Sequence, residues 1–260
     1  MKKKIFSILS FIITTSALSA LSEQDESMVT IDFRAFLWPS HAPIAAMSND
    51  PAKSSFMHLQ GPGNQYTPPE VAYLENGKDR ERTFQLLDDR LSAPLNYQGP
   101  VDLTFYQAGS PLSDPKTRNP IANLKIPRGA RELTIFFFPK ENGTYKLFPV
   151  DTSPGSIPAG SARIYNLSTA PLACKLDDSD FAIEPGKSHL TPFTLPSQHY
   201  QPILVASLSR EGKWKRSLAR KLIVNDEDRL LVIIYNLEAN PDSYNLLRLV
   251  FRDEATPPEI

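Results

Sequence analysis

The sequence predicts an all-β protein built from antiparallel β-sandwiches, and two observations support this fold class. Proline is frequent (24 residues) and glycine is not (11), a balance that disfavours long helices and favours extended segments separated by turns. Short runs of β-branched and aromatic residues also recur between turn-forming residues, and many short strands at regular spacing are typical of sandwiches. We expect strands over residues 30–38, 81–87, 101–107, 132–138, 144–150, 162–167, 203–208, 230–235 and 246–251.

One segment, 78–91, is also a candidate for a helix. The apolar spacing from Phe84 to Tyr97 fits a strand, a turn at Asp88-Asp89 and a second strand at least as well as it fits a helical face. We therefore expect a hairpin here.

Turn chemistry supports two further hairpins. Asn142-Gly143 lies between two apolar runs and can supply the positive φ angles of a tight hairpin turn, and residues 210–212 play a similar part before Trp214. The acidic runs 177–180 and 226–228 are expected to be solvated turns. Neither has the loop length or the spaced acids of a dedicated Ca²⁺ site.

A short internal repeat indicates two domains. Residues 34–38 and 42–45 parallel residues 163–167 and 170–173, and each pair of segments would begin with the opening strand of a similar unit. The Pro- and Gly-containing stretch 152–160 would lie between the units. One continuous double-sheet body is the alternative. The expected boundaries are 27–151 for the first sandwich domain, 161–253 for the second and 254–260 for a short flexible tail.

The first twenty residues have the three parts of a secretory signal peptide. Lysines at 2–4 precede an apolar run at 5–18 and the small residues Ser19 and Ala20. Because about fourteen apolar and small residues fall short of the ~20 needed to span a bilayer, a cleaved signal peptide at 1–20 is favoured over a retained anchor. We expect cleavage between Ser19 and Ser22, export to the periplasm or the extracellular space, and no transmembrane segment in the mature chain.

Cys174 is the only cysteine of the chain. No intramolecular disulfide can form, despite the oxidising destination, and no cysteine lies at the cleavage point to carry a lipid anchor. Cys174 lies in an alternating segment without a neighbouring histidine. This environment predicts a small buried hydrophobic residue and not a reactive thiol.

The charge of the chain does not indicate a nucleic-acid partner. Removal of the signal peptide lowers the number of basic residues from 28 to 25, against 29 acidic residues, so the mature chain carries a net charge near −4. The densest basic cluster surrounds Trp214. It can be the solvent-exposed face of a hairpin or a binding patch, and the interspersed apolar residues favour the hairpin face. Its basic members are Lys213, Lys215, Arg216, Arg220 and Lys221.

Three segments, at 97–106, 158–168 and 184–187, resemble an uncharacterised family of exported bacterial proteins. The resemblance covers about residues 95–253 and rests on turn and strand patterns, not on chemical motifs. It implies immunoglobulin-like β-sandwich domains and export. It implies no activity, because none is assigned to that family.

No catalytic, cofactor-binding or metal-binding residue is predicted. The histidines at 41, 58, 189 and 199 lack the spacing of metal ligands, and the chain has no Gly-x-Ser-x-Gly motif. The Gly61-Pro62-Gly63 segment lacks the third glycine of a dinucleotide loop. Since a glycosidase needs only two carboxylates, the acids of the first domain stay candidates, although nothing singles out a pair. They are Glu70, Glu75, Asp88, Asp89, Asp102 and Asp114.

Most aromatic residues fall on expected strands, which favours packing in a core. An exposed aromatic cluster would instead indicate stacking on sugar rings or on a hydrophobic partner. Phe136, Phe137 and Phe138 break strict alternation, which predicts a strand buried on both faces at a domain junction.

Together these features predict an exported, non-catalytic protein with a binding or structural role in the bacterial envelope, with an envelope protein or polysaccharide as partner. One alternative is a hydrolase or carbohydrate-binding protein that acts on an extracellular polymer through a carboxylate pair or an exposed aromatic face. Another is an assembly subunit whose sheet edge accepts a partner strand.

Overall fold

The computed structural model describes residues 28–38, 68–75, 80–109, 117–194, 200–209, 211–237 and 240–252. This part of the chain is all-β and contains no helix, which confirms the predicted fold class. The predicted signal peptide, 1–20, and tail, 254–260, lie outside the described residues. The strands are β1 (Met28–Leu37), β2 (Glu70–Glu75), β3 (Arg80–Gln85), β4 (Leu95–Pro100), β5 (Asp102–Gln107), β6 (Pro120–Lys125), β7 (Glu132–Pro139), β8 (Tyr145–Asp151), β9 (Ser161–Asn166), β10 (Leu172–Leu176), β11 (Ser179–Ile183), β12 (Ser188–Pro192), β13 (Tyr200–Leu208), β14 (Trp214–Ile223), β15 (Arg229–Leu237) and β16 (Asn240–Phe251).

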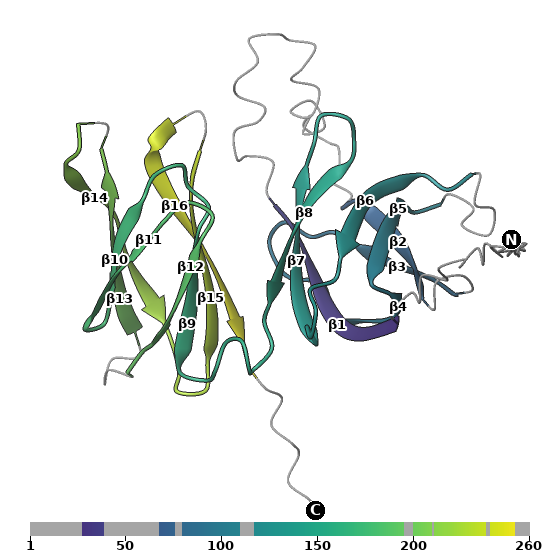
Figure 1. The fold of residues 1–260 in the computed structure, drawn as a ribbon, viewed down its shortest axis with the longest axis horizontal. Coiled ribbons are helices and arrows are strands. Elements are labelled where there is room, and N and C mark those ends of the chain that lie inside the picture. The colour runs from purple at the N-terminus through teal and green to yellow at the C-terminus, as the bar shows by residue number, and fades with distance from the viewer. Residues whose placement is uncertain are drawn as a thin grey trace, which may run out of the picture.

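The strands form four sheets, which we call sheet A (β4-β1-β7-β8), sheet B (β3-β2-β5-β6), sheet C (β12-β9-β15-β16) and sheet D (β11-β10-β13-β14). Sheets A and B enclose one hydrophobic core, and sheets C and D enclose a second. The chain therefore folds as two tandem β-sandwiches. In Figure 1 the sheets follow one another as layers, in the order D, C, A and B from left to right.

The two sandwiches have the same topology. In each, the first strand lies between the fourth and the seventh, and the second lies between the third and the fifth. The repeated sequence segments begin on β1 and β9, the first strands of the two units. Phe36 and Tyr165, which match in the repeat, both face the boundary between the sandwiches.

Most strand pairs are antiparallel, as predicted, and each sandwich adds one parallel pair. β1 pairs in parallel with β7, and β9 pairs in parallel with β15. A parallel pair requires a long crossover connection, and in each sandwich the five intervening strands provide it.

The two cores differ in composition. The first contains a cluster of aromatic rings in edge-to-face or tilted contact, with centroids 5.1 to 6.4 Å apart. The members of this cluster are Phe33, Tyr73, Phe84, Phe105 and Phe137. Aliphatic side chains dominate the second core, where Phe193 and Tyr244 are the only buried aromatic residues among those that the structure describes. Aromatic pairs of this geometry each add about 0.5–1.5 kcal/mol beyond burial.

A third hydrophobic cluster joins the sandwiches through the outer faces of sheets A and C. Phe137 points into the first core, whereas Phe136 and Phe138 point into this junction, so β7 is buried on both faces as predicted. Trp38 stacks on Phe138 with ring centroids 4.8 Å apart and contacts Tyr235 of β15, also at 4.8 Å. The contact between Trp38 and Tyr235 crosses directly from one sandwich to the other.

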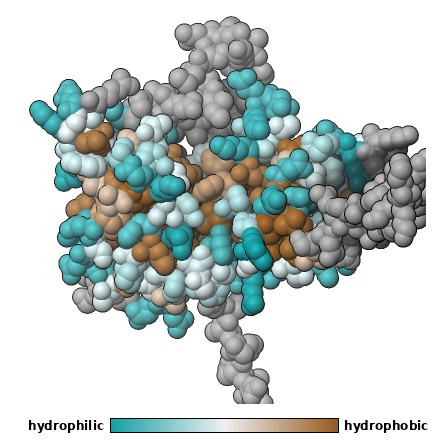
Figure 2. Space-filling model, viewed as in Figure 1, coloured by the Kyte–Doolittle hydropathy of each residue, from teal (hydrophilic) through white to brown (hydrophobic). Residues whose placement is uncertain are grey.

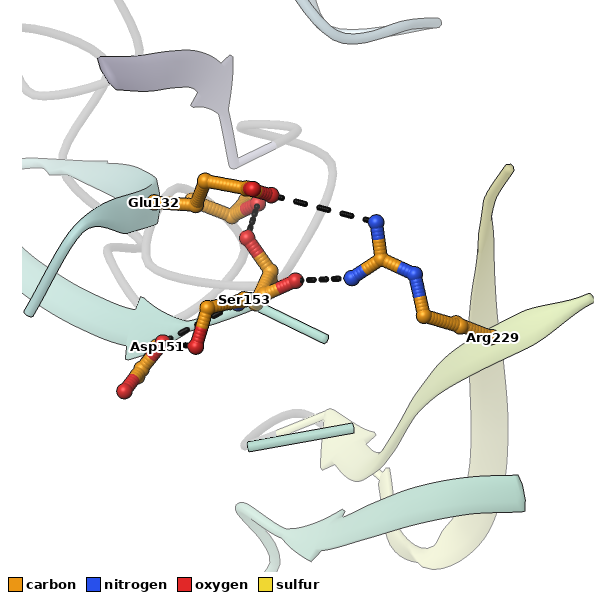
Figure 3. Close-up of polar contacts among 6 residues, drawn as sticks. Glu132, Asp151, Ser153 and Arg229 are labelled. Carbon is orange, nitrogen blue, oxygen red and sulfur yellow. Dashed lines mark hydrogen bonds and ion pairs between the residues drawn. The ribbon is translucent and has the colours of Figure 1, made fainter. Parts of the chain in front are cut away.

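A buried arginine adds a polar contact to the junction (Figure 3). The guanidinium of Arg229, at the start of β15, donates a hydrogen bond to the carbonyl of Thr152 and lies 3.8 Å from the Glu132 carboxylate. The side chain of Arg229 is only 4% exposed. On the other side of the contact, the amide of Thr152 donates to the carbonyl of Glu132, which fixes the acceptor in place.

The linker 152–160 is packed and hydrogen-bonded. Ile157 is fully buried in the junction cluster, and its amide donates to the carbonyl of Ser153. Arg163 of β9 donates to the carbonyl of Ser156, and the amide of Gly160 donates to the carbonyl of Asp228. The connection is therefore held by both sandwiches.

All nine predicted strands are present, and their bounds agree within three residues except at β16, which begins six residues before the expected start at 246. The prediction did not include β2, β6, β10, β11 or β12, which are five or six residues long. Ser179 and Asp180 were expected in a turn, but they begin β11, because they pair with Leu176 and Lys175 of β10.

The expected hairpin within 78–97 is wrong, although both of its strands exist. β3 pairs with β2 in sheet B, whereas β4 pairs with β1 in sheet A. The segment therefore crosses from one sheet of the sandwich to the other. Ser92 fixes this crossing, because its hydroxyl accepts a hydrogen bond from the Ala35 amide.

The two other predicted hairpins are confirmed. β7 pairs with β8 and β13 with β14, and the turn glycines Gly143 and Gly212 both have a φ of +75°. Both angles fall in the left-handed region that glycine adopts without strain.

The acidic turn 226–228 is only partly solvated, since Asp228 is 1% exposed. Burial acts to raise the pKa of Asp228, but hydrogen bonds from Arg252 and from Asn225 outweigh it and hold the pKa below its usual value. The carboxylate of Asp228 thus ties the start of β15 to the end of β16.

Candidate binding surface

The candidate carboxylates of the first sandwich have the contacts of surface acids. Glu75 accepts a hydrogen bond from Arg82 at 3.0 Å and lies 3.6 Å from Arg80. Asp89 lies 3.8 Å from its neighbour Arg90. Glu70 and Asp102 are exposed, Asp88 is half-buried in a bend, and Asp114 lies outside the described residues. None of the five candidate acids that the structure describes has a distinct catalytic environment in these contacts.

The described residues hold no group of three or more His, Cys, Asp and Glu side chains that could bind a metal ion. His189 stacks on Phe181, with ring centroids 4.2 Å apart, and belongs to the packing of the second sandwich. His41, His58 and His199 lie outside the described residues.

Cys174 is buried on the inner face of sheet D, as the sequence predicts. Burial raises the pKa of its thiol to about 12, so the thiol is protonated at neutral pH. A protonated, buried thiol is a poor nucleophile.

The described aromatic residues pack mainly inside the molecule. Trp38, Tyr73, Tyr97 and Tyr244 are each less than 9% exposed. Trp214, by contrast, is 52% exposed. Tyr66 lies outside the described residues.

The outer face of sheet D carries an unusual concentration of exposed apolar side chains. Five large hydrophobic side chains are exposed in the described part of the chain, and Leu204, Trp214 and Ile223 of sheet D are three of them. Cross-strand partners share one face of a sheet, and the register places these residues opposite Ala219, Leu208 and Tyr200. At the left end of the molecule in Figure 2, hydrophobic side chains lie among hydrophilic ones in the layer of this sheet.

A shallow groove of about 600 Å³ crosses this face. Its floor is a row of three alanines, Ala182, Ala173 and Ala206, which lie opposite one another on β11, β10 and β13. The row ends at Arg216 of β14, opposite Ala206. Because alanine side chains are a single methyl group, the floor lies low and the surface is hollowed.

The neighbouring row forms one side of the groove. It consists of Asp180, Lys175 and Leu204, which lie opposite one another on the same three strands. Lys175 and Asp180 form an ion pair at 3.6 Å. The groove therefore offers apolar contact along its length and a cation at its β14 end.

A second hollow, of about 250 Å³, lies on the other side of β14, between this strand and β16. Three of its lining residues are basic, namely Arg220, Lys221 and Arg248, and the others are Leu222, Ile223 and Leu246. Cations therefore line a hollow on each side of β14. We call the outer face of sheet D together with β14 the sheet D surface.

Side chains cap the free edge of β14. The carbonyls of Lys215, Ala219 and Ile223 accept hydrogen bonds from Ser217, Arg220 and Arg248. A bulge between Val205 and Ala206 further disturbs the pairing with β13. Charged side chains and bulges are devices that blunt sheet edges, so β14 is a poor acceptor for an added strand.

The sequence identified the basic cluster but not the groove. Residues 211–223 are mostly exposed on a hairpin strand, as predicted. The groove depends on alanines from three strands, which the register brings into one row, and no local pattern marks them.

Comparison with models of known protein families gives no match, and comparison with curated protein sequences gives none either. The described residues contain no helix that is long and apolar enough to cross a membrane.

Proposed function

We propose that this chain is an exported, non-catalytic protein of the bacterial envelope that binds a partner through the sheet D surface. The family resemblance and the basic and apolar start of the sequence support export to the periplasm or the extracellular space. The expected class of partner is an envelope protein or polysaccharide.

The observation that carries the proposal is the contrast between sheet D and the other sheets. The outer faces of sheets A and C cover each other at the junction, and Ala72 and Leu74 on the outer face of sheet B are buried. Among the described residues, the outer face of sheet D has three exposed large apolar side chains, whereas sheets A and C have one each, Met28 and Leu190. Exposed apolar patches on a stable protein commonly mark interaction sites.

Site-specific photo-crosslinking in a cell that exports the protein tests this proposal. A photoreactive amino acid replaces Leu204, and a control variant carries it at Leu190, which is similarly exposed (38% against 41%) but lies on β12 of sheet C. We expect a discrete adduct from position 204 and none from position 190. Equal adducts, or none from position 204, would contradict the proposal.

Export is tested separately. Mass spectrometry of the protein recovered from the periplasm or the medium should show a mature chain that begins between Ser19 and Ser22. A chain that stays in the cytoplasm and still carries Lys2 to Lys4 would contradict the predicted export.

A further inference from the structure

From the charge and the shape of the sheet D surface, we infer that its partner is a protein with an acidic, partly apolar segment that lies across the alanine-floored groove. This inference rests on the proposed function and specifies the chemistry of the partner. Apolar side chains of the segment occupy the groove, and its carboxylates face the cations of β14.

The charge of β14 is the first argument. Residues 211–223 contain five basic side chains, those of Lys213, Lys215, Arg216, Arg220 and Lys221, against one acidic side chain, Glu211. None of the five pairs with a carboxylate among the described residues. The whole chain is slightly negative, with a formal net charge of −1, so the cluster is a local excess and not a general property. Such a field attracts acidic partners and speeds their association.

The same charge disfavours a second copy of this chain on this face. A two-fold symmetric contact with its axis across the strands would place the five cations of one copy against those of the other. Like charges opposed across an interface are strongly unfavourable.

The groove lining is the second argument, and it favours a protein over a polysaccharide. Three alanine methyl groups form the floor, and Leu204 stands beside it. These side chains offer no hydrogen bonds to sugar hydroxyl groups, whereas they suit aliphatic or aromatic side chains. Arg216, at the end of the row, can bind a carboxylate through two parallel hydrogen bonds.

The capped edge of β14 defines how the segment lies. Because the carbonyls of Lys215, Ala219 and Ile223 are already bonded to side chains, the segment rests over the face and does not add a strand beside β14. The contact is therefore made by side chains.

A defined polymer tests the inference with the mature protein. The probe is a random copolymer of glutamate and tyrosine, and its binding is measured by isothermal titration calorimetry and by quenching of tryptophan fluorescence with acrylamide. The chain has two tryptophans. Trp38 is 5% exposed and serves as an internal reference, whereas Trp214 is 52% exposed. We expect bound copolymer to protect Trp214 from acrylamide.

Matched variants localise the binding. Arg216→Gln with Lys221→Gln should weaken copolymer binding by about tenfold, because two cations without a carboxylate partner among the described residues are lost. The control, Lys125→Gln with Arg128→Gln, removes two exposed charges at the end of β6, the strand of the first sandwich that corresponds to β14, and should leave binding within about twofold. Leu204→Ser should weaken binding of the copolymer but not of poly-glutamate. Far-ultraviolet circular dichroism confirms that each variant is folded.

Two parallel probes distinguish the alternatives. Binding of polygalacturonate, or of phosphatidylglycerol vesicles, that is tighter than copolymer binding and depends on Arg216 and Lys221 would overturn the inference in favour of a polysaccharide or a membrane. Failure of the copolymer to bind would also overturn it. The crosslinking experiment at Leu204 would still decide whether the surface is used, so the two proposals can fail independently.

Discussion

Sheets C and D form one sandwich, yet the outer face of sheet C packs against the other sandwich and the outer face of sheet D is exposed. The outer face of sheet C presents Leu231, Ile233, Leu249 and Phe251, and it is sealed against sheet A. The outer face of sheet D presents alanines, cations and a few exposed apolar side chains. The two sheets share one topology position by position with those of the first sandwich. The difference between their outer faces therefore comes from side-chain size and charge, which determine whether a face packs against a neighbouring sheet or is exposed to solvent.

The largest expected effect comes from removing a ring at the closed face. Phe136 is fully buried between the sandwiches and contacts Phe36 and Trp38. Phe136→Ala should lower the free energy of unfolding by about 3–5 kcal/mol, the usual cost of a large cavity. Urea denaturation followed by circular dichroism measures this change. A loss as small as that at an exposed site would show that the two sandwiches hardly depend on each other.

A smaller effect is expected from the polar contact at the same face. Arg229→Met keeps an apolar stem but leaves the carbonyl of Thr152 without its charged donor. We expect a loss of about 1–3 kcal/mol, the cost of a buried group left without a partner. Glu132→Gln provides the control, because Glu132 is 43% exposed and lies 3.8 Å from the guanidinium, so the loss should be well below that of the arginine variant.

Cys174 reports how often sheet D opens beneath the exposed face. Because its thiol is buried and its pKa is raised to about 12, modification by a disulfide reagent at pH 8 should be far slower in the native protein than in urea. Labelling at the same rate in both states would show that the sheet opens freely.

The same residue gives a pH dependence. In the unfolded chain the thiol ionises above about pH 8.5, whereas in the native protein it stays protonated up to a pKa of about 12. The free energy of unfolding should therefore fall as pH rises above 8.5. Cys174→Ala should flatten this slope between pH 8.5 and 10, and a slope unchanged by the variant would contradict the assignment to Cys174.

The smallest effect on stability is expected at the open face. Leu204 is 41% exposed, so Leu204→Ser should change the free energy of unfolding by no more than about 0.5 kcal/mol. Thermal unfolding of this variant beside Phe136→Ala gives the comparison directly. A large loss would mean that Leu204 serves the fold, and it would weaken the case for a binding surface.

The sequence was sufficient for the features that depend on local pattern. Short runs of β-branched and aromatic residues located nine strands, Asn142-Gly143 located a hairpin, and the three consecutive phenylalanines located a strand buried on both faces. Each of these signals lies within a few neighbouring residues.

Features set by the pairing of distant residues were not predictable. The segment after Phe84 continues into the opposite sheet because β4 pairs with β1, which lies about 60 residues earlier in the chain. The groove of sheet D likewise requires Ala173 to align with both Ala182 and Ala206, which only the register establishes. Asp228 was expected in solvent, but its carboxylate is buried and accepts a hydrogen bond from Arg252, which follows β16.

The packed linker has a mechanical consequence. Since Ile157 is buried and the carbonyls of Thr152 and Ser156 are bonded to the second sandwich, a force applied to the first sandwich is transmitted to sheet D without a hinge to absorb it. The two sandwiches should therefore move as one rigid body. A partner held on sheet D would then be kept at a fixed distance and orientation from whatever holds the first sandwich.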